Sequence, residues 1–202
     1  DNLAFQRRLL RSELDPGKTM ESFDFSGALT EHQATFRELA LGQYIDRREN
    51  LFIHGPSGVG KSHLAQALGH TACRQGRDVL FRRTSPFLKH LVAGHGDGSY
   101  PRRLETVAKF PVLILDDFGL EAIGEQEQTC LFDLIIARYE KASTIITSNR
   151  DFGEWQSVFT NPLIASAALD RLVHRALQVT IDKESYRLKA FMLKNRKEPA
   201  EN

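Results

Sequence analysis

The residues GPSGVGKS at positions 55–62 have the types and spacing of a phosphate-binding loop, G-x-x-x-x-G-K-[ST]. Glycines at positions 58 and 60 let the backbone curl, so that its N–H groups point toward phosphate oxygens. The lysine of this pattern, Lys61, reaches the β- and γ-phosphates, and the hydroxyl of Ser62 is a Mg²⁺ ligand. We therefore predict ATP and Mg²⁺ as cofactors. The residues expected to bind the nucleotide are Gly55, Pro56, Ser57, Gly58, Val59, Gly60, Lys61, Ser62 and His63.

Two acids, Asp116 and Asp117, directly follow the apolar run VLIL. Asp117-Phe118-Gly119 spells the Mg²⁺-binding tripeptide of protein kinases, but the kinase glycine-rich loop and H-R-D loop are missing from the sequence before it. In a P-loop protein, Asp116 holds Mg²⁺ through its water shell and Asp117 polarises the water that attacks the γ-phosphate. The alternative for Asp117 is a capping role in the next turn. We expect Phe118-Gly119 only to turn the chain away from the nucleotide.

Polar residues at two later positions are candidates for sensing the nucleotide. Asn149 follows the strand-like run TIITS, where its amide can bind the γ-phosphate or align the water; a turn-forming asparagine is the alternative. Arg171 and Arg175 are four residues apart and therefore share a helix face. An arginine here is either a surface residue or an arginine finger that acts on the nucleotide of a neighbouring subunit.

The pattern of the chain predicts the elements that must position these residues. Apolar runs predict strands at 51–55, 78–83, 111–115, 143–148 and 177–181. Helical spacing predicts helices at 61–76, 102–110, 125–141 and 163–176. A further helix is expected to begin with Ser85 as its cap and Pro86 in its first turn, and residues 93–101 to form a glycine-rich loop. Strands that alternate with helices predict an α/β fold with a central parallel sheet covered on both faces.

We expect three segments along the chain. Residues 1–27 are predicted to be an N-terminal arm and linker, residues 28–182 the ATPase domain and residues 183–202 a short tail. The chain begins at Asp1 rather than at a methionine, so we expect further residues upstream. Phe23 and Phe25 in the arm are expected to pack in the core or, alternatively, against the adenine ring.

Charge and cysteine content narrow the class of protein. The chain has 27 Lys and Arg against 26 Asp and Glu, so no overall basic field marks a nucleic-acid-binding protein. Four adjacent arginine pairs are instead either solvated surface residues or a stripe that contacts phosphates. Cys73 and Cys130 lack metal-site spacing and are expected to be buried free thiols. Without a signal peptide or a bilayer-length apolar run, we expect a cytoplasmic protein with no membrane partner.

Four stretches resemble the IstB family, the AAA+ ATPase helper proteins of bacterial insertion sequences, which are relatives of the helicase loader DnaC. They are RRENLFIHGPSGVGKSHLAQALGHTACRQG, VLILDDFGL, STIITSNRDFGEWQSVFTNPLIASAALDRLVHRA and SYRLK. The resemblance extends over residues 20–190. Its third stretch is more specific than the nucleotide motifs, which many ATPases share.

The resemblance implies a role for each of several residues. Asn149 corresponds to the family's first sensor and Arg171 to its arginine finger, with Arg175 as the alternative finger. Together with Lys61 and Asp117 they form the expected catalytic set, and Ser62 and Asp116 form the expected metal set. In initiator-type AAA+ proteins a helix inserted after the second strand faces central DNA. The residues expected to contact the DNA backbone are Arg82, Arg83, Lys89, Arg102 and Arg103.

The resemblance also implies a function and an architecture. It implies a P-loop NTPase (AAA+) three-layer fold with a reduced or absent lid domain. It implies ATP-dependent homo-oligomers on duplex DNA, largely without sequence specificity, that recruit and stimulate a transposase. The closest alternative is a helicase loader of the DnaC type, which uses the same nucleotide motifs on a hexameric helicase. A small-molecule P-loop kinase and a non-hydrolysing, nucleotide-gated DNA-binding module are alternatives from other classes.

Overall fold

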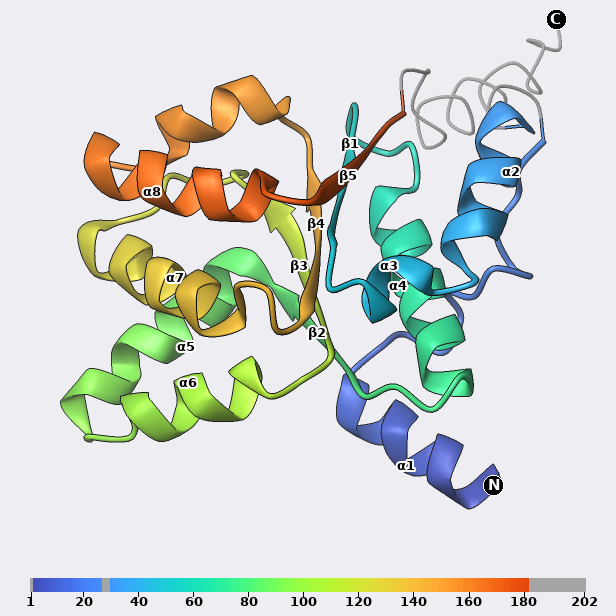
Figure 1. Ribbon diagram of the computed structural model, residues 1–202, viewed down its shortest axis with the longest axis horizontal. Coiled ribbons are helices and arrows are strands. Elements are labelled where there is room, and N and C mark those ends of the chain that lie inside the picture. The colour runs from blue at the N-terminus through green and yellow to red at the C-terminus, as the bar shows by residue number, and fades with distance from the viewer. Residues whose placement is uncertain (1, 27–29, 182–202) are drawn as a thin grey trace, which may run out of the picture.

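A five-stranded parallel sheet forms the centre of the molecule, with the strand order β2-β3-β4-β1-β5 (Figure 1). The computed structural model describes residues 2–26 and 30–181. The strands are β1 Asn50–His54, β2 Val79–Arg83, β3 Val112–Phe118, β4 Ser143–Ser148 and β5 Ala176–Thr180. The three central strands are buried almost throughout, because helices cover both faces of the sheet. The predicted α/β fold with a covered parallel sheet is therefore confirmed.

Helices form a layer on each side of the sheet, as Figure 1 shows. One layer consists of α1 Asn2–Ser12, α2 Thr30–Leu39, α3 Gln43–Asp46 and α4 Lys61–Arg74. The other consists of α5 Thr84–Gly96, α6 Tyr100–Ala108, α7 Glu125–Arg138, the 3₁₀ helix η2 Phe152–Val158 and α8 Pro162–Val173. Each layer has its own apolar cluster against the sheet, so two cores hold the three layers together.

The segment that follows α1 is fastened along α4. The N–H of Asp15 donates to Gln66 Oε1 at 2.8 Å, and the carbonyl oxygen of Asp15 lies 2.8 Å from His70 Nε2. Nearer the phosphate loop, the carbonyl oxygen of Thr19 lies 2.9 Å from His63 Nε2. These contacts place the segment beside the start of α4. The predicted division at residues 27 and 28 stays a prediction, and the tail at 183–202 lies outside the described residues.

The predicted boundaries of α5 are wrong at both ends. The helix begins at Thr84 rather than after Ser85, and it continues through the glycine-rich segment to Gly96. Gly94 explains the error, because a Cβ atom at this position would lie 2.9 Å from the backbone of Tyr100. This glycine permits close packing of α5 against the start of α6, whereas the sequence pattern suggested a loop. The connection between the two helices is only residues 97–99.

Cys73 and Cys130 are buried free thiols, as predicted. Burial raises the pKa of Cys73 to about 11, so this thiol stays protonated at neutral pH. Within residues 2–26 and 30–181, no helix has both the length and the apolar character needed to cross a bilayer.

Candidate nucleotide-binding site

A cavity of about 680 Å³ opens where several parallel strands end, the edge at which open α/β sheets bind ligands. It brings together residues from the phosphate loop, from the ends of β2 and β3, from the residue after β4 and from the N-terminal segment. Its predicted members are Ser57, Gly58, Gly60, Lys61, Ser62, His63, Arg83, Asp116, Asp117 and Asn149. Residues distant in sequence thus share one concave site.

The phosphate loop holds its own lysine in place. Lys61 Nζ donates to the carbonyl oxygens of Gly55, at 2.8 Å, and Pro56, at 2.7 Å. Burial lowers the pKa of Lys61, and the nearby carboxylates of Asp117 and Asp116 oppose that effect. The glycine at position 60 has φ +96°, and a Cβ atom there would lie 2.6 Å from the ring of Phe23. The tight turn before α4 therefore requires glycine.

Ser62 and Asp116 form a donor set suited to Mg²⁺. Ser62 Oγ lies 2.6 and 2.8 Å from the two carboxylate oxygens of Asp116. The described residues contain no cluster of three or more His, Cys, Asp or Glu side chains that would enclose a metal by themselves. One hydroxyl and one carboxylate beside a phosphate loop instead fit a cation that is mostly held by water and by the phosphates of a nucleotide.

Both acids of β3 reach the cavity because the strand is irregular between Leu115 and Phe118. Consecutive residues of a regular strand point to opposite faces of the sheet. Here Asp117 has φ +57°, a left-handed conformation that redirects its side chain. The N–H of Asp117 donates to Thr147 Oγ1 at 3.0 Å, which holds this conformation. The β-bulge therefore explains how two adjacent carboxylates line one site.

Thr147 contributes to the site, although the sequence analysis did not select it. Its side chain is fully buried in β4, and its hydroxyl donates to Asp116 Oδ1 at 2.5 Å. The same hydroxyl oxygen accepts the N–H of Asp117. A threonine in an apolar strand is normally a sign of β-propensity. Its position two residues before Asn149 is the only sequence signal for its role.

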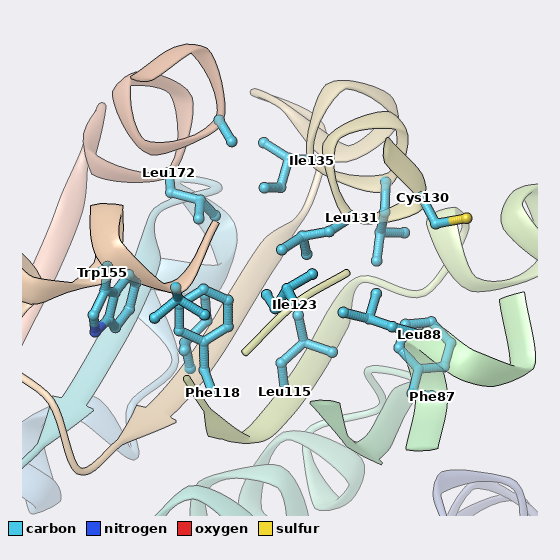
Figure 2. Close-up of a cluster of buried hydrophobic side chains, with 14 of the residues drawn as sticks. Phe87, Leu88, Leu115, Phe118, Ile123, Cys130, Leu131, Ile135, Trp155 and Leu172 are labelled. Atoms are coloured by element: carbon cyan, nitrogen blue, oxygen red, sulfur yellow. The ribbon is translucent and has the colours of Figure 1, made fainter. Parts of the chain in front are cut away.

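The interpretation of Phe118 as part of a simple turn is wrong. Phe118 is fully buried as the last residue of β3, and its ring centroid lies 4.6 Å from that of Trp155 in η2 (Figure 2). Trp155 in turn lies 4.9 Å from the ring of Phe52 in β1. The turn begins only at Gly119, which has φ +74°. Phe118 is thus an aromatic anchor directly beside the two acids.

Asn149 lies in the cavity with Lys61 and Asp117, as its predicted role requires. It is exposed, and the residue before it ends the buried strand β4. Phe23 and Phe25 pack against the apolar cluster on the α4 side, in contact with each other at 4.6 Å between ring centroids. Phe23 also lies beside Gly60 of the phosphate loop.

Arg171 does not line this cavity. It lies at the opposite end of the strands, where β1 begins. It belongs to the last turn of α8, where its guanidinium donates to the Ala167 carbonyl oxygen and lies over the ring of Phe132. The next residue, Leu172, accepts a hydrogen bond from the side chain of Asn50, the first residue of β1. The phosphate loop follows the other end of β1, roughly 15 Å away at about 3.3 Å per residue. Arg175 lines the same small depression as Arg171.

The residues predicted to contact DNA fall into two groups. Arg82 pairs with Glu13 at 2.6 Å, and Arg83 lines the nucleotide cavity. The other three lie on the hairpin formed by α5 and α6. Lys89 pairs with Glu121 at 3.2 Å, and Arg103 binds Asp97 at 2.9 Å and the carbonyl oxygen of His90. Arg102 is exposed, and among the described residues it has no ion-pair partner.

A sequence profile described as "IstB-like ATP binding protein" matches residues 1–193. A protein of Sinorhizobium fredii, named as an insertion sequence ATP-binding protein, is 42% identical over 180 residues, which are 89% of this chain and 74% of the relative. A protein of Mycobacterium tuberculosis, named as an ATP-binding protein in an insertion sequence, is 39% identical over 188 residues, which are 93% of this chain and 75% of the relative.

Solved structures share the fold at lower sequence identity. The DnaC helicase loader has a TM-score of 0.71 at 20% identity, over 82% of this chain and 97% of that chain. DnaA from Aquifex aeolicus, solved with AMPPCP, has a TM-score of 0.70 at 24% identity, over 92% of this chain and 56% of that chain. These similarities assign the three layers to the AAA+ P-loop fold.

Proposed function

This chain belongs to the family of IstB-like ATP-binding proteins of insertion sequences, and from that premise we propose that it hydrolyses ATP and assembles on duplex DNA to assist a transposase. The observation that carries hydrolysis is the β-bulge of β3, which adds a second carboxylate, Asp117, to the cavity containing Lys61. A carboxylate beside the expected γ-phosphate position is a candidate general base for the attacking water, which supports hydrolysis rather than binding alone.

In the proposed reaction, each residue of the cavity has a separate task. Lys61 exchanges the carbonyl oxygens of its own loop for the β- and γ-phosphates. Asp117 accepts a proton from the attacking water, and the amide of Asn149 aligns that water or binds the γ-phosphate. Ser62 and Asp116 would hold Mg²⁺, which when bound would neutralise phosphate charge.

We further propose that Arg171 completes the site of a neighbouring subunit. Its distance from the phosphate loop of the same chain supports this assignment, because an arginine finger in trans must lie on a face that the cavity does not reach. The guanidinium would then stabilise transition-state charge only after two chains have met. Hydrolysis would thereby depend on a homo-oligomer.

The proposed DNA contacts lie on the hairpin of α5 and α6. Arg102 is the most available cation, because Lys89 and Arg103 already have carboxylate partners. Contacts to phosphates alone bind duplex DNA without reading its sequence, which suits a helper that acts at many target sites. The similarity to the DnaC helicase loader supports only the fold, so it does not favour a loader over a transposase helper.

The proposal is tested by measuring ATP hydrolysis with and without duplex DNA. We expect duplex DNA to increase the rate of the wild-type protein. Lys61→Ala should lose ATP binding, whereas Asp117→Asn should bind ATP and hydrolyse it about 10²-fold or more slowly, within the range for loss of a general base. An Asp117→Asn protein that hydrolyses ATP at the wild-type rate would contradict the assigned chemistry.

The DNA part of the proposal needs its own comparison. Arg102→Glu should weaken duplex binding and make it less sensitive to salt, since one phosphate contact is lost. Arg37→Glu is the matched control, because Arg37 is also exposed but lies on α2 in the other helical layer. Equal affinities for the two variants would remove Arg102 from the proposed DNA surface. Binding of a helicase rather than the transposase in a pull-down with purified partners would favour the loader.

A further inference from the structure

The loop that carries Asn149 is fastened to two different strands. On the β3 side, Arg150 Nε donates to the carbonyl oxygen of Gly119 at 2.7 Å, and Ser148 Oγ donates to that of Phe118 at 2.8 Å. From η2, Trp155 Nε1 donates to the carbonyl oxygen of Arg150 at 3.3 Å. Figure 2 shows Trp155 beside Phe118 in this part of the core. These contacts tie the loop to the turn after the two acids.

A separate contact ties the same loop to the strand that leads into the phosphate loop. His54, the last residue of β1, is 4% exposed, and its Nδ1 lies 2.8 Å from Asp151 Oδ1. Among the described residues this buried Nδ1 has no hydrogen-bond partner, and the Asp151 carboxylate is a neighbouring acceptor at ion-pair distance. His54 also directly precedes Gly55, whose N–H donates to the carbonyl oxygen of Ser148 at 3.3 Å.

The other ring nitrogen of His54, Nε2, is in contact with two polar side chains of β5. On the other side of the ring, Nε2 lies 2.8 Å from Thr180 Oγ1 and is also approached by the side-chain amide of Gln178. With the Gln178 amide N–H donating to it, Nε2 is the acceptor, which places a ring hydrogen on Nδ1, toward Asp151. The carboxylate of Asp151 is therefore the natural acceptor for a buried donor.

Asp151 also has a structural role, because it forms a capping box with Glu154 at the start of η2. Asp151 precedes η2, where a carboxylate commonly caps the helix. Here the Asp151 N–H donates to Glu154 Oε2 at 3.0 Å, and the Glu154 N–H donates to the main-chain oxygen of Asp151 at 2.9 Å. The Asp151 carboxylate thus stands at the start of η2 and also lies 2.8 Å from His54 Nδ1, so its substitution must be tested for effects on folding as well as on rate.

We propose that His54 and Asp151 are positioning residues that hold Asn149 at the γ-phosphate of bound ATP. Asn149 lies two residues before Asp151, between the strand that carries the phosphate loop and the strand that carries the acids. A catalytic group misplaced by about 1 Å can lose a hundredfold in rate. This inference rests on the proposed ATP hydrolysis and adds a means of orienting its amide.

The test compares Asp151→Ala with Asp151→Asn, which keeps an oxygen acceptor for His54. We expect Asp151→Ala to lower kcat roughly tenfold with little change in KM, a moderate misplacement effect. Asp151→Asn should remain near the wild-type rate, and so should Glu38→Ala, an exposed acid on α2. Circular dichroism should show that all four proteins are folded at the assay temperature, and the Tm of Asp151→Ala should fall because the buried His54 loses its carboxylate neighbour. Wild-type kcat for Asp151→Ala would overturn the proposal.

A double-mutant cycle separates positioning from general loosening. If Asp151 acts through Asn149, Asp151→Ala should cause no further loss in an Asn149→Ala background. Effects that multiply in the double variant would overturn the proposal. His54→Asn, whose amide N–H can replace the ring Nδ1–H, should retain more activity than His54→Phe. Should His54→Phe fail to fold, the Asp151 variants still decide the outcome.

Nucleotide affinity distinguishes failure of this inference from failure of the proposed function. Wild-type protein without ATPase activity, with or without DNA, would refute hydrolysis. The preference for ATPγS over ADP then tests the positioning contact, because only ATPγS has a γ-phosphate group. We expect Asn149→Ala and Asp151→Ala to reduce that preference similarly. An unchanged preference in Asp151→Ala would overturn the proposal, even in a protein that does not hydrolyse ATP.

Discussion

The hydroxyl of Thr147 is hydrogen-bonded to both acids of the site, since it donates to Asp116 Oδ1 and accepts the N–H of Asp117. A valine in its place would keep the shape and the β-propensity but remove both interactions. The left-handed Asp117 would lose its main-chain partner, and the carboxylate of Asp116 would lose a buried donor. One oxygen atom therefore supports the geometry of two carboxylates.

We predict that Thr147→Val lowers the free energy of unfolding by about 1–3 kcal/mol, the cost of a buried polar group without its partner. ATPase activity should fall as well, because both acids lose their orientation. Thr147→Ser, which keeps the hydroxyl, should retain most of the activity. Urea unfolding and steady-state ATPase assays measure the two effects. Full activity in Thr147→Val would show that the rest of the site holds the acids without this hydroxyl.

Individual site residues differ in how visible they are in the sequence. Lys61, Ser62 and Asp116 stand in patterns whose spacing follows from the chemistry of phosphate and Mg²⁺. The direction of the Asp117 side chain was not visible, because it depends on a bulge whose register shift arises between two strands. Thr147 was hidden because a buried threonine and an ordinary strand residue look alike in sequence.

At the scale of secondary-structure elements, the buried side chain of Arg138 connects the end of α6 to the start of β4. The guanidinium donates to Phe110 O at 2.7 Å, to Ser143 O at 2.6 Å and to Thr144 Oγ1 at 3.1 Å. Its longer contacts reach the final carbonyl oxygens of α6. Burial lowers the pKa of Arg138 to about 9, so these oxygens must replace water around the charge.

We predict that Arg138→Met lowers the free energy of unfolding by about 3 kcal/mol, because several buried carbonyl oxygens lose their donor. Arg11→Met is the matched control, since Arg11 is a mostly exposed arginine that pairs with Asp78 at 3.2 Å. That surface pair should contribute less than about 1 kcal/mol. Denaturant unfolding gives both values. A similar loss for both variants would contradict the capping role of Arg138.

The elements themselves were largely predictable, because the spacing of apolar residues indicates which face of a strand or helix is buried. Each predicted strand exists within a few residues of its expected range. The segment at 93–101 was misjudged because glycine permits both a loop and close helix packing, and only the neighbouring helix decides between them. The short η2 was missed, although its Trp155 and Phe152 contribute to the aromatic cluster beside the acids.

At the scale of the whole molecule, the nucleotide cavity lies where the strands of the sheet end, and Arg171 lies where they begin. We predict that Arg171→Ala alone and Asp117→Asn alone are nearly inactive, but that their mixture recovers part of the ATPase activity. A mixed oligomer contains some interfaces with an intact cavity on one chain and an intact arginine on the next. Steady-state assays over a range of mixing ratios measure the recovery.

The same mixing experiment with Arg175→Ala identifies the finger. If Arg175 rather than Arg171 acts on the neighbour, only the Arg175→Ala mixture should show recovery. If the activity of each mixture equals the sum of the activities of its two variants, each chain hydrolyses ATP without a neighbour. The sequence predicted both arginines but not their placement, because the position of α8 relative to the phosphate loop depends on the strand order of the sheet.

Because the cavity and Arg171 lie at opposite ends of the strands, the rate of ATP hydrolysis would depend on the local concentration of chains. Under the proposed arrangement, a single chain in dilute solution carries two half-sites and no complete one. Its specific activity should rise with protein concentration and level off once neighbours are always present. DNA would then stimulate hydrolysis partly by raising the local concentration of bound chains. The ATPase rate would increase with that concentration even without a transposase.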